Sequence, residues 1–129
     1  MQDLGTLGGN HSIARAINDA GQIVGLSTNS EKQIHAFLYA NGVMRDLGTL
    51  GGSSSLAYAI NARGQVVGSS TTAAGNTHAF LYDDGVMHDL GTLGGNTAAA
   101  RGINDSGNIV GYSYNSTGKG HAFLLPINP

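Results

Sequence analysis

Three histidines, one in each third of the chain, are the residues best suited to carry chemistry. His35, His78 and His121 each open a His-Ala-Phe-Leu motif and follow one another at intervals of 43 residues. Equivalent imidazoles brought together around an axis could bind a metal ion. We favour a structural role, because a polar residue repeated in every unit usually holds that unit together. We therefore predict no metal and no cofactor, and a hydrogen-bond network of His35, His78, His121, Asp3, Asp46 and Asp89.

Two other repeated motifs look like catalytic or phosphate-binding motifs but lack the elements that such motifs need. Ser27 and its equivalents lie in Gly-x-Ser contexts, but the nucleophile elbow of hydrolases requires a strand-to-helix turn, and the sequence shows no helix signal. The repeated Thr-Leu-Gly-Gly lacks the lysine and the helix that follow a phosphate-binding loop. We therefore predict that the protein is not an enzyme.

Residues that differ between the thirds of the chain are the candidates for ligand binding, because the constant residues are needed for folding. Arginine and tyrosine are enriched at binding hot spots, and an aromatic ring can stack on a sugar. The absence of tryptophan weakens this reading. A carbohydrate is the ligand class that we predict for a site drawn from His11, Arg15, Tyr58, Arg101, Tyr112 and Tyr114.

These residues are positioned by a sequence repeat that covers the whole chain. Residues 1–43, 44–86 and 87–129 align without insertions or deletions, and each begins with Met-x-Asp-Leu-Gly-Thr-Leu-Gly-Gly. A period of this length is typical of solenoids, propellers and arrays. We predict one repeat domain that spans residues 1–129.

Each repeat reads as four short strands. In the first copy they are residues 12–18, 22–27, 35–39 and 43–47, with glycine-containing turns at 19–21 and 40–42. Four strands in about 40 residues match a propeller blade. The constant glycine pair at 8 and 9 suits a link between blades where φ is unusual. The predicted class is all-β, a β-propeller of three four-stranded blades; a β-trefoil, with three four-stranded units, remains the alternative.

The glycine-rich motif, the Ala-x-x-Ile-Asn-x-x-Gly segment and His-Ala-Phe-Leu resemble the HAF repeat family of bacterial proteins over the entire chain. The resemblance implies a propeller-like array that is extracellular or on the cell surface, and it transfers no catalytic residue. One departure is Leu125, where the other two copies have Tyr39 and Tyr82.

Three blades are too few to close a propeller, which typically has about 4 to 8. The chain opens with an unpaired fourth strand, residues 1–7, and stops after a third strand. One chain could therefore complete the last blade of another, since open strand edges invite pairing. We predict a homodimer that forms a six-bladed ring, with three chains and nine blades as a poorer solution. A trefoil would be a monomer.

Composition and charge argue against nucleic acid and membrane as partners. A net charge of −2 with only six Lys and Arg provides no basic surface for nucleic acid. The apolar runs are far shorter than the roughly 20 residues of a membrane-spanning helix, and no signal peptide is recognisable in this chain. We therefore interpret the protein as a non-catalytic, self-assembling repeat scaffold, either a fragment or an engineered array, with a lectin-like propeller as the alternative.

Overall fold

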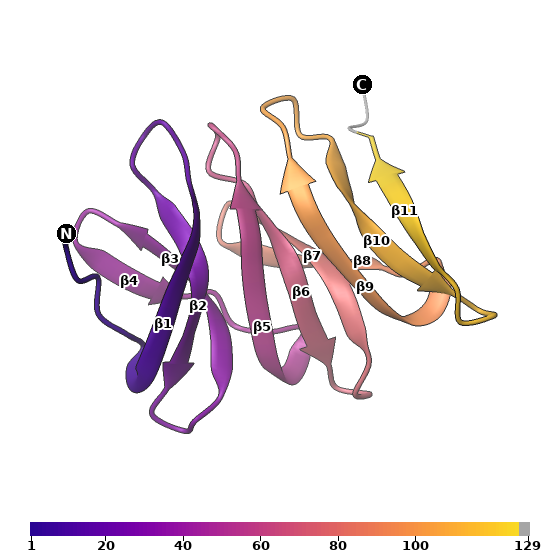
Figure 1. Cartoon of the computed structure of the whole chain (residues 1–129), viewed down its shortest axis with the longest axis horizontal. Coiled ribbons are helices and arrows are strands. Elements are labelled where there is room, and N and C mark those ends of the chain that lie inside the picture. The colour runs from indigo at the N-terminus through magenta and orange to yellow at the C-terminus, as the bar shows by residue number, and fades with distance from the viewer. Residues whose placement is uncertain (127–129) are drawn as a thin grey trace.

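The computed structural model describes residues 1–126, and these contain β-strands and no helix (Figure 1). Consecutive strands form three antiparallel meanders. Meander 1 contains β1 (Gly8–Ile17), β2 (Ile23–Asn29), β3 (Ile34–Ala40) and β4 (Val43–Asp46). Meander 2 contains β5 (Gly51–Ile60), β6 (Val66–Thr72), β7 (Thr77–Asp83) and β8 (Val86–Gly91). Meander 3 contains β9 (Gly94–Ile103), β10 (Ile109–Asn115) and β11 (Gly120–Leu125).

The meanders follow one another along the molecule, with the amino terminus and β11 at opposite extremes (Figure 1). Meander 1 is a sheet of its own, and one parallel pair, Thr77 with Thr97, joins meanders 2 and 3 into a second sheet. The all-β class is therefore confirmed. Within the described residues the two sheets do not close on themselves, as a monomeric trefoil would require.

The hairpin turns have the chemistry that the sequence predicts. Asn41 and Gly42 both have positive φ, 54° and 80°, as two-residue turns between right-twisted strands require. In the turn between β1 and β2, the Asn18 side chain accepts a hydrogen bond of 2.9 Å from the backbone N–H of Gln22. These local bonds define the strand ends.

Two features differ from the expectation. The first strand begins at Gly8 rather than at residue 12, because the backbone at Gly9 packs so closely on Thr28 that a Cβ there would collide with its side chain. Residues 1–6 are not in a strand, since no neighbouring strand is available to pair with them; Leu7 makes only an isolated bridge to Asn29. Meander 3 has three strands within the described residues and ends, as expected, in the strand that contains His121.

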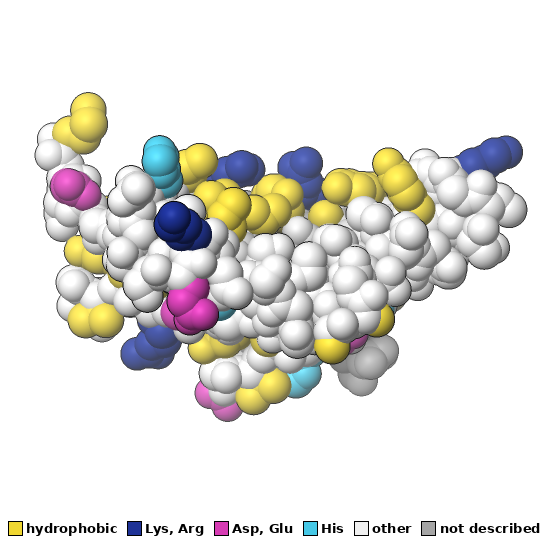
Figure 2. All heavy atoms as spheres, turned by 90° about the horizontal axis from the view of Figure 1, so that it is seen from below, with side chains coloured by type: hydrophobic (Ala, Val, Ile, Leu, Met, Phe, Trp, Pro, Cys, Tyr) yellow, Lys and Arg dark blue, Asp and Glu magenta, His cyan; other side chains and the backbone are white. Residues whose placement is uncertain are grey.

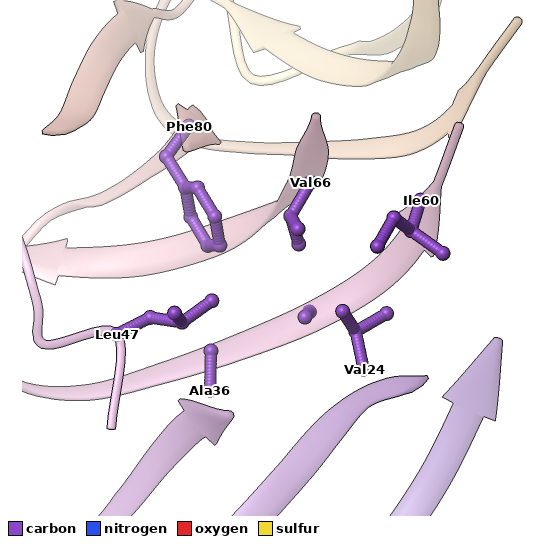
Figure 3. Close-up of a cluster of buried hydrophobic side chains, with 7 residues drawn as sticks. Val24, Ala36, Leu47, Ile60, Val66 and Phe80 are labelled. Atoms are coloured by element: carbon purple, nitrogen blue, oxygen red, sulfur yellow. The ribbon is translucent and has the colours of Figure 1, made fainter. Parts of the chain in front are cut away.

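The core lies between successive meanders. Figure 3 shows the cluster between meanders 1 and 2, which contains Val24, Ala36, Leu47, Ala57, Ile60, Val66 and Phe80. A second cluster, between meanders 2 and 3, contains Val67, Ala79, Ala98, Ala100 and Ile109. Burial of a Val, Leu, Ile or Phe side chain stabilises a fold by about 1.5–3 kcal/mol. Each meander therefore depends on its neighbours for much of its stability.

Candidate functional site

Two of the repeated histidines each bind an aspartate of the same meander. His35 Nδ1 lies 2.9 Å from Asp46 Oδ1, and His78 Nδ1 lies 2.8 Å from Asp89 Oδ1. Each histidine is on the third strand of its meander, and each aspartate is on the fourth. The pair therefore ties the outermost strand to its neighbour.

The other two members of the predicted network, Asp3 and His121, lie at opposite ends of the chain and remain apart. Asp3 Oδ1 accepts a hydrogen bond of 2.9 Å from the N–H of Gly5, and the structure pairs it with no histidine. His121 is exposed on β11 and has no carboxylate partner among residues 1–126. Each end of the chain thus carries one half of a pair that is complete in meanders 1 and 2.

Serine, histidine and aspartate lie close together in this arrangement, but the serine is not available as a nucleophile. Ser70 is paired with His78 across β6 and β7, yet it is 1 % exposed. Its Oγ accepts a hydrogen bond of 2.8 Å from the N–H of Leu50 and lies within hydrogen-bond distance of two backbone carbonyls. No hydrogen bond joins it to the histidine. This serine fixes the link that leads from meander 1 into its own meander.

The link between meanders has one conformation that is repeated three times. Asp46 accepts from Gly48 N–H, and Thr49 Oγ1 donates to the carbonyl of Gly52. The N-terminal segment makes the matching bonds around Asp3, Thr6 and Leu7, whose N–H donates to Ser27 Oγ at 2.8 Å. Residues 1–7 therefore have the shape of a link.

Five of the six predicted ligand-binding residues form a continuous row. The guanidinium of Arg101 lies 4.3 Å from the ring centroid of Tyr58 and 5.8 Å from that of Tyr112. Arg15 lies 5.5 Å from the Tyr58 ring on its other side, and Tyr114 continues the row at 6.4 Å from Tyr112. Figure 2 shows basic and hydrophobic side chains alternating along one long edge of the molecule.

The row crosses all three meanders because Arg15, Tyr58 and Arg101 occupy one repeat position on β1, β5 and β9. Neither arginine forms a salt bridge within residues 1–126. Guanidinium groups stacked on tyrosine retain N–H donors for a ligand. This row is the part of the described surface best suited to bind a polar ligand.

The sixth residue, His11, lies apart from this row. It lines an open hollow of about 220 Å³ together with Asn10, Thr28 and Lys32. The side chains there come from β1, the end of β2 and the β2–β3 turn, and no contact joins them to Tyr58. The structure therefore divides the predicted site into a row and a separate hollow.

The two end faces of the molecule expose apolar side chains whose equivalents in the other repeats are buried between neighbouring meanders. Ile60 is 9 % exposed because it packs on meander 1, whereas its equivalent Ile17 is 66 % exposed. Val67 is fully buried against meander 3, whereas its equivalent Val110 is 48 % exposed, and Leu124 is 62 % exposed beside it. Each end face is therefore one half of the interface that joins successive meanders.

An open array of three blades predicts apolar end faces, but the sequence does not identify their residues individually. Ile17, Val110 and Leu124 belong to apolar positions that read as core in every repeat, so nothing in one repeat distinguishes them. Only the number of meanders shows which copies are uncovered.

No group of three or more metal-binding side chains lies together among the described residues, and no helix there is long and apolar enough to cross a membrane. No protein-family model, curated protein or solved structure matches the chain. The resemblance to the HAF repeat family therefore stays a prediction. The apolar end faces and the Arg–Tyr row are the two surface features of the described residues that suggest a function.

Proposed function

We propose that this protein is a non-catalytic repeat scaffold whose meanders are three blades of a β-propeller that a second copy completes. One observation carries the proposal: the chain ends in the two halves of an interface that it already forms twice internally. Ile17 at one end corresponds to buried Ile60, and Val110 at the other corresponds to buried Val67. The face of one copy should therefore fit the opposite face of another.

The number of blades favours two copies. Propellers typically have about 4 to 8 blades, so three would leave a ring open, six would close it and nine would exceed the usual range. A head-to-tail contact that repeats closes into a ring when the rotation allows it. We place this ring outside the cytoplasm, as the resemblance to HAF repeat proteins implies.

The exposed side chains provide a driving force. Burial of a side chain such as Ile17 or Leu124 contributes about 1.5–3 kcal/mol, and both interfaces of a ring would bury such residues. Clustered apolar surface on a protein commonly marks a contact site. The same surface would otherwise favour disordered aggregation.

Charge placed on either face tests the proposal. We expect Ile17→Glu and Leu124→Glu each to reduce the mass measured by light scattering to that of one chain, because each blocks both interfaces of a two-copy ring. Val86→Glu is the matched control: Val86 is 53 % exposed, and its equivalent Val43 is exposed as well, so neither meets a neighbouring meander.

A mixture of the two variants tests the head-to-tail arrangement. Each variant retains one intact face, so equal amounts of Ile17→Glu and Leu124→Glu should form an open dimer that neither forms alone. Unchanged assembly of the single variants would refute the end-face contact. No complex in the mixture would refute the head-to-tail geometry.

A glycan-binding module is the second candidate, and the stacked Arg–Tyr row favours it. Aromatic faces flanked by unpaired guanidinium groups suit a sugar that also carries an acidic group. Saturable binding of such a glycan that is lost in both Tyr58→Ala and Arg15→Ala would support this function. Binding that survives both substitutions would place the ligand elsewhere.

A further inference from the structure

We propose, on the basis of the self-assembling scaffold above, that residues 1–7 of one copy supply the missing fourth strand on β11 of a second copy, together with the link that follows it. In this arrangement Asp3 binds the partner's His121. The proposal goes beyond contact between end faces, because it assigns a strand, a register and a His–Asp hydrogen bond to the junction.

The receiving edge is on β11. In meanders 1 and 2 the third strand pairs on both sides: β3 lies between β2 and β4, and β7 between β6 and β8. In meander 3, β11 pairs with β10 alone among the described strands. The outer edge of β11 therefore presents backbone groups that a further strand would satisfy.

The side chains beside this edge are also incompletely covered. Phe37 and Phe80 are 1 % and 0 % exposed, whereas their equivalent Phe123 is only partly buried. A cavity of about 220 Å³ is lined by residues that include Leu90, Leu93 and Phe123. This cavity lies next to β11. In meanders 1 and 2, a fourth strand lies at the corresponding place.

The donor segment already has the required sequence and shape. Residues 1–7 share the pattern Met-x-Asp-Leu-Gly-Thr-Leu with residues 44–50, which supply β4 and the following link. The bond from Leu7 N–H to Ser27 Oγ matches the bond from Leu50 N–H to Ser70 Oγ, both at 2.8 Å. Because the segment is preorganised, little conformational entropy remains to be lost when a partner binds.

The first residues of the segment are free to pair. Met1, Gln2 and Asp3 are exposed, and the amino terminus lies at the opposite end of the molecule from β11 (Figure 1). The segment therefore cannot reach the β11 edge of its own chain. A second copy that joins end to end would bring the two together.

The unpaired side chains match as well. His35 with Asp46 and His78 with Asp89 show that this position binds a carboxylate at 2.8–3.0 Å. Among residues 1–126, His121 on β11 has no carboxylate partner and Asp3 in the donor segment has no histidine partner. These two residues would complete the same pair between copies. The third meander would then have the same bonds as the other two.

The internal registers fix which residues should face each other. Leu38 pairs with Arg45, and Leu81 pairs with His88. By the same offset of 43 residues, Leu124 of one copy should face Gln2 of the other. Directly opposed residues have their Cβ atoms about 4.5–5.5 Å apart, and a shift by one residue points the side chain to the other face.

A disulfide cross-link tests this register, and the chain has no cysteine that would interfere. We expect the double variant Gln2→Cys with Leu124→Cys to form, under mild oxidation, a covalent dimer on a non-reducing denaturing gel. The control shifted by one residue, Gln2→Cys with Leu125→Cys, should cross-link at least tenfold more slowly. Leu81→Cys with His88→Cys provides the rate for a correctly paired strand within one chain.

The outcomes separate this inference from the proposed function. Cross-linking that prefers position 124 supports strand exchange in the predicted register. A dimer by light scattering with no cross-link, or with equal rates at positions 124 and 125, would overturn strand exchange and leave the end-face scaffold intact. A chain that is monomeric throughout would overturn both proposals.

Discussion

Asn61 donates from its side-chain Nδ2 to the backbone carbonyl of Asn104 at 3.0 Å, and the two residues are one repeat apart. Asn18 makes the same bond to the carbonyl of Asn61, also at 3.0 Å. These asparagines also organise the turn of their own hairpin, so one side chain joins local and inter-meander structure. The contact between meanders is therefore specified by hydrogen bonds as well as by apolar packing.

We predict that Asn61→Asp lowers the free energy of unfolding by about 1–3 kcal/mol, the cost of leaving a buried polar group without a partner. Nδ2 lies 2.7 Å from Gln65 Oε1 and 3.0 Å from the Asn104 carbonyl, so an acidic oxygen would face two acceptors. Urea denaturation measures the change. Asn29→Asp, which loses only a weak bond of 3.4 Å within its own turn, is the control and should cost less.

Phe80 is the side chain whose loss should damage the core most. It is 0 % exposed in the cluster between meanders 1 and 2. We expect Phe80→Ala to lower the free energy of unfolding by about 3–5 kcal/mol through lost burial and the cavity that remains. Val43→Ala, at an exposed position, should change it by less than about 0.5 kcal/mol. Similar losses in the two variants would contradict the assigned core.

The His–Asp pair of meander 2 should stabilise the fold modestly. Asp89→Ala removes the acceptor for His78 Nδ1 and for the N–H of Gly91 at 2.8 Å. Because the carboxylate is 46 % exposed, we expect a loss of only about 1 kcal/mol in the free energy of unfolding. Glu31→Ala, on an exposed turn, is the control. A larger effect in the control would refute the role of the pair.

The Arg–Tyr row should show coupling between its members. A double-mutant cycle with Arg101→Ala and Tyr58→Leu should give a coupling energy of about 0.5–1 kcal/mol, as expected for an exposed cation–π contact. Thermal or urea unfolding of the four proteins supplies the values. Strict additivity would mean that the two side chains are neighbours without interacting.

Much of the local structure was predictable from the sequence. The turns at residues 19–21 and 40–42 follow from glycine and asparagine chemistry, and the third strand around His35 follows from its run of apolar residues. The pairing of His35 with Asp46 rather than Asp3 needed the strand order. It follows because the fourth strand of a meander comes from the start of the next repeat.

The remainder depends on contacts between repeats, which a single repeat does not encode. Ile17 and Ile60 are the same residue at the same repeat position, yet one is exposed and the other buried. The stacking of Arg15, Tyr58 and Arg101 likewise requires that successive meanders place this position along one edge. Neither propensity nor periodicity contains that information.

Native mass spectrometry of the unmodified chain over a concentration series tests the central claim most directly. Self-completion of an open array predicts a species of twice the 13.1 kDa of one chain, and no larger regular series as concentration rises. A single species of 13.1 kDa at every concentration would contradict it, because the apolar end faces would then remain exposed without a partner copy.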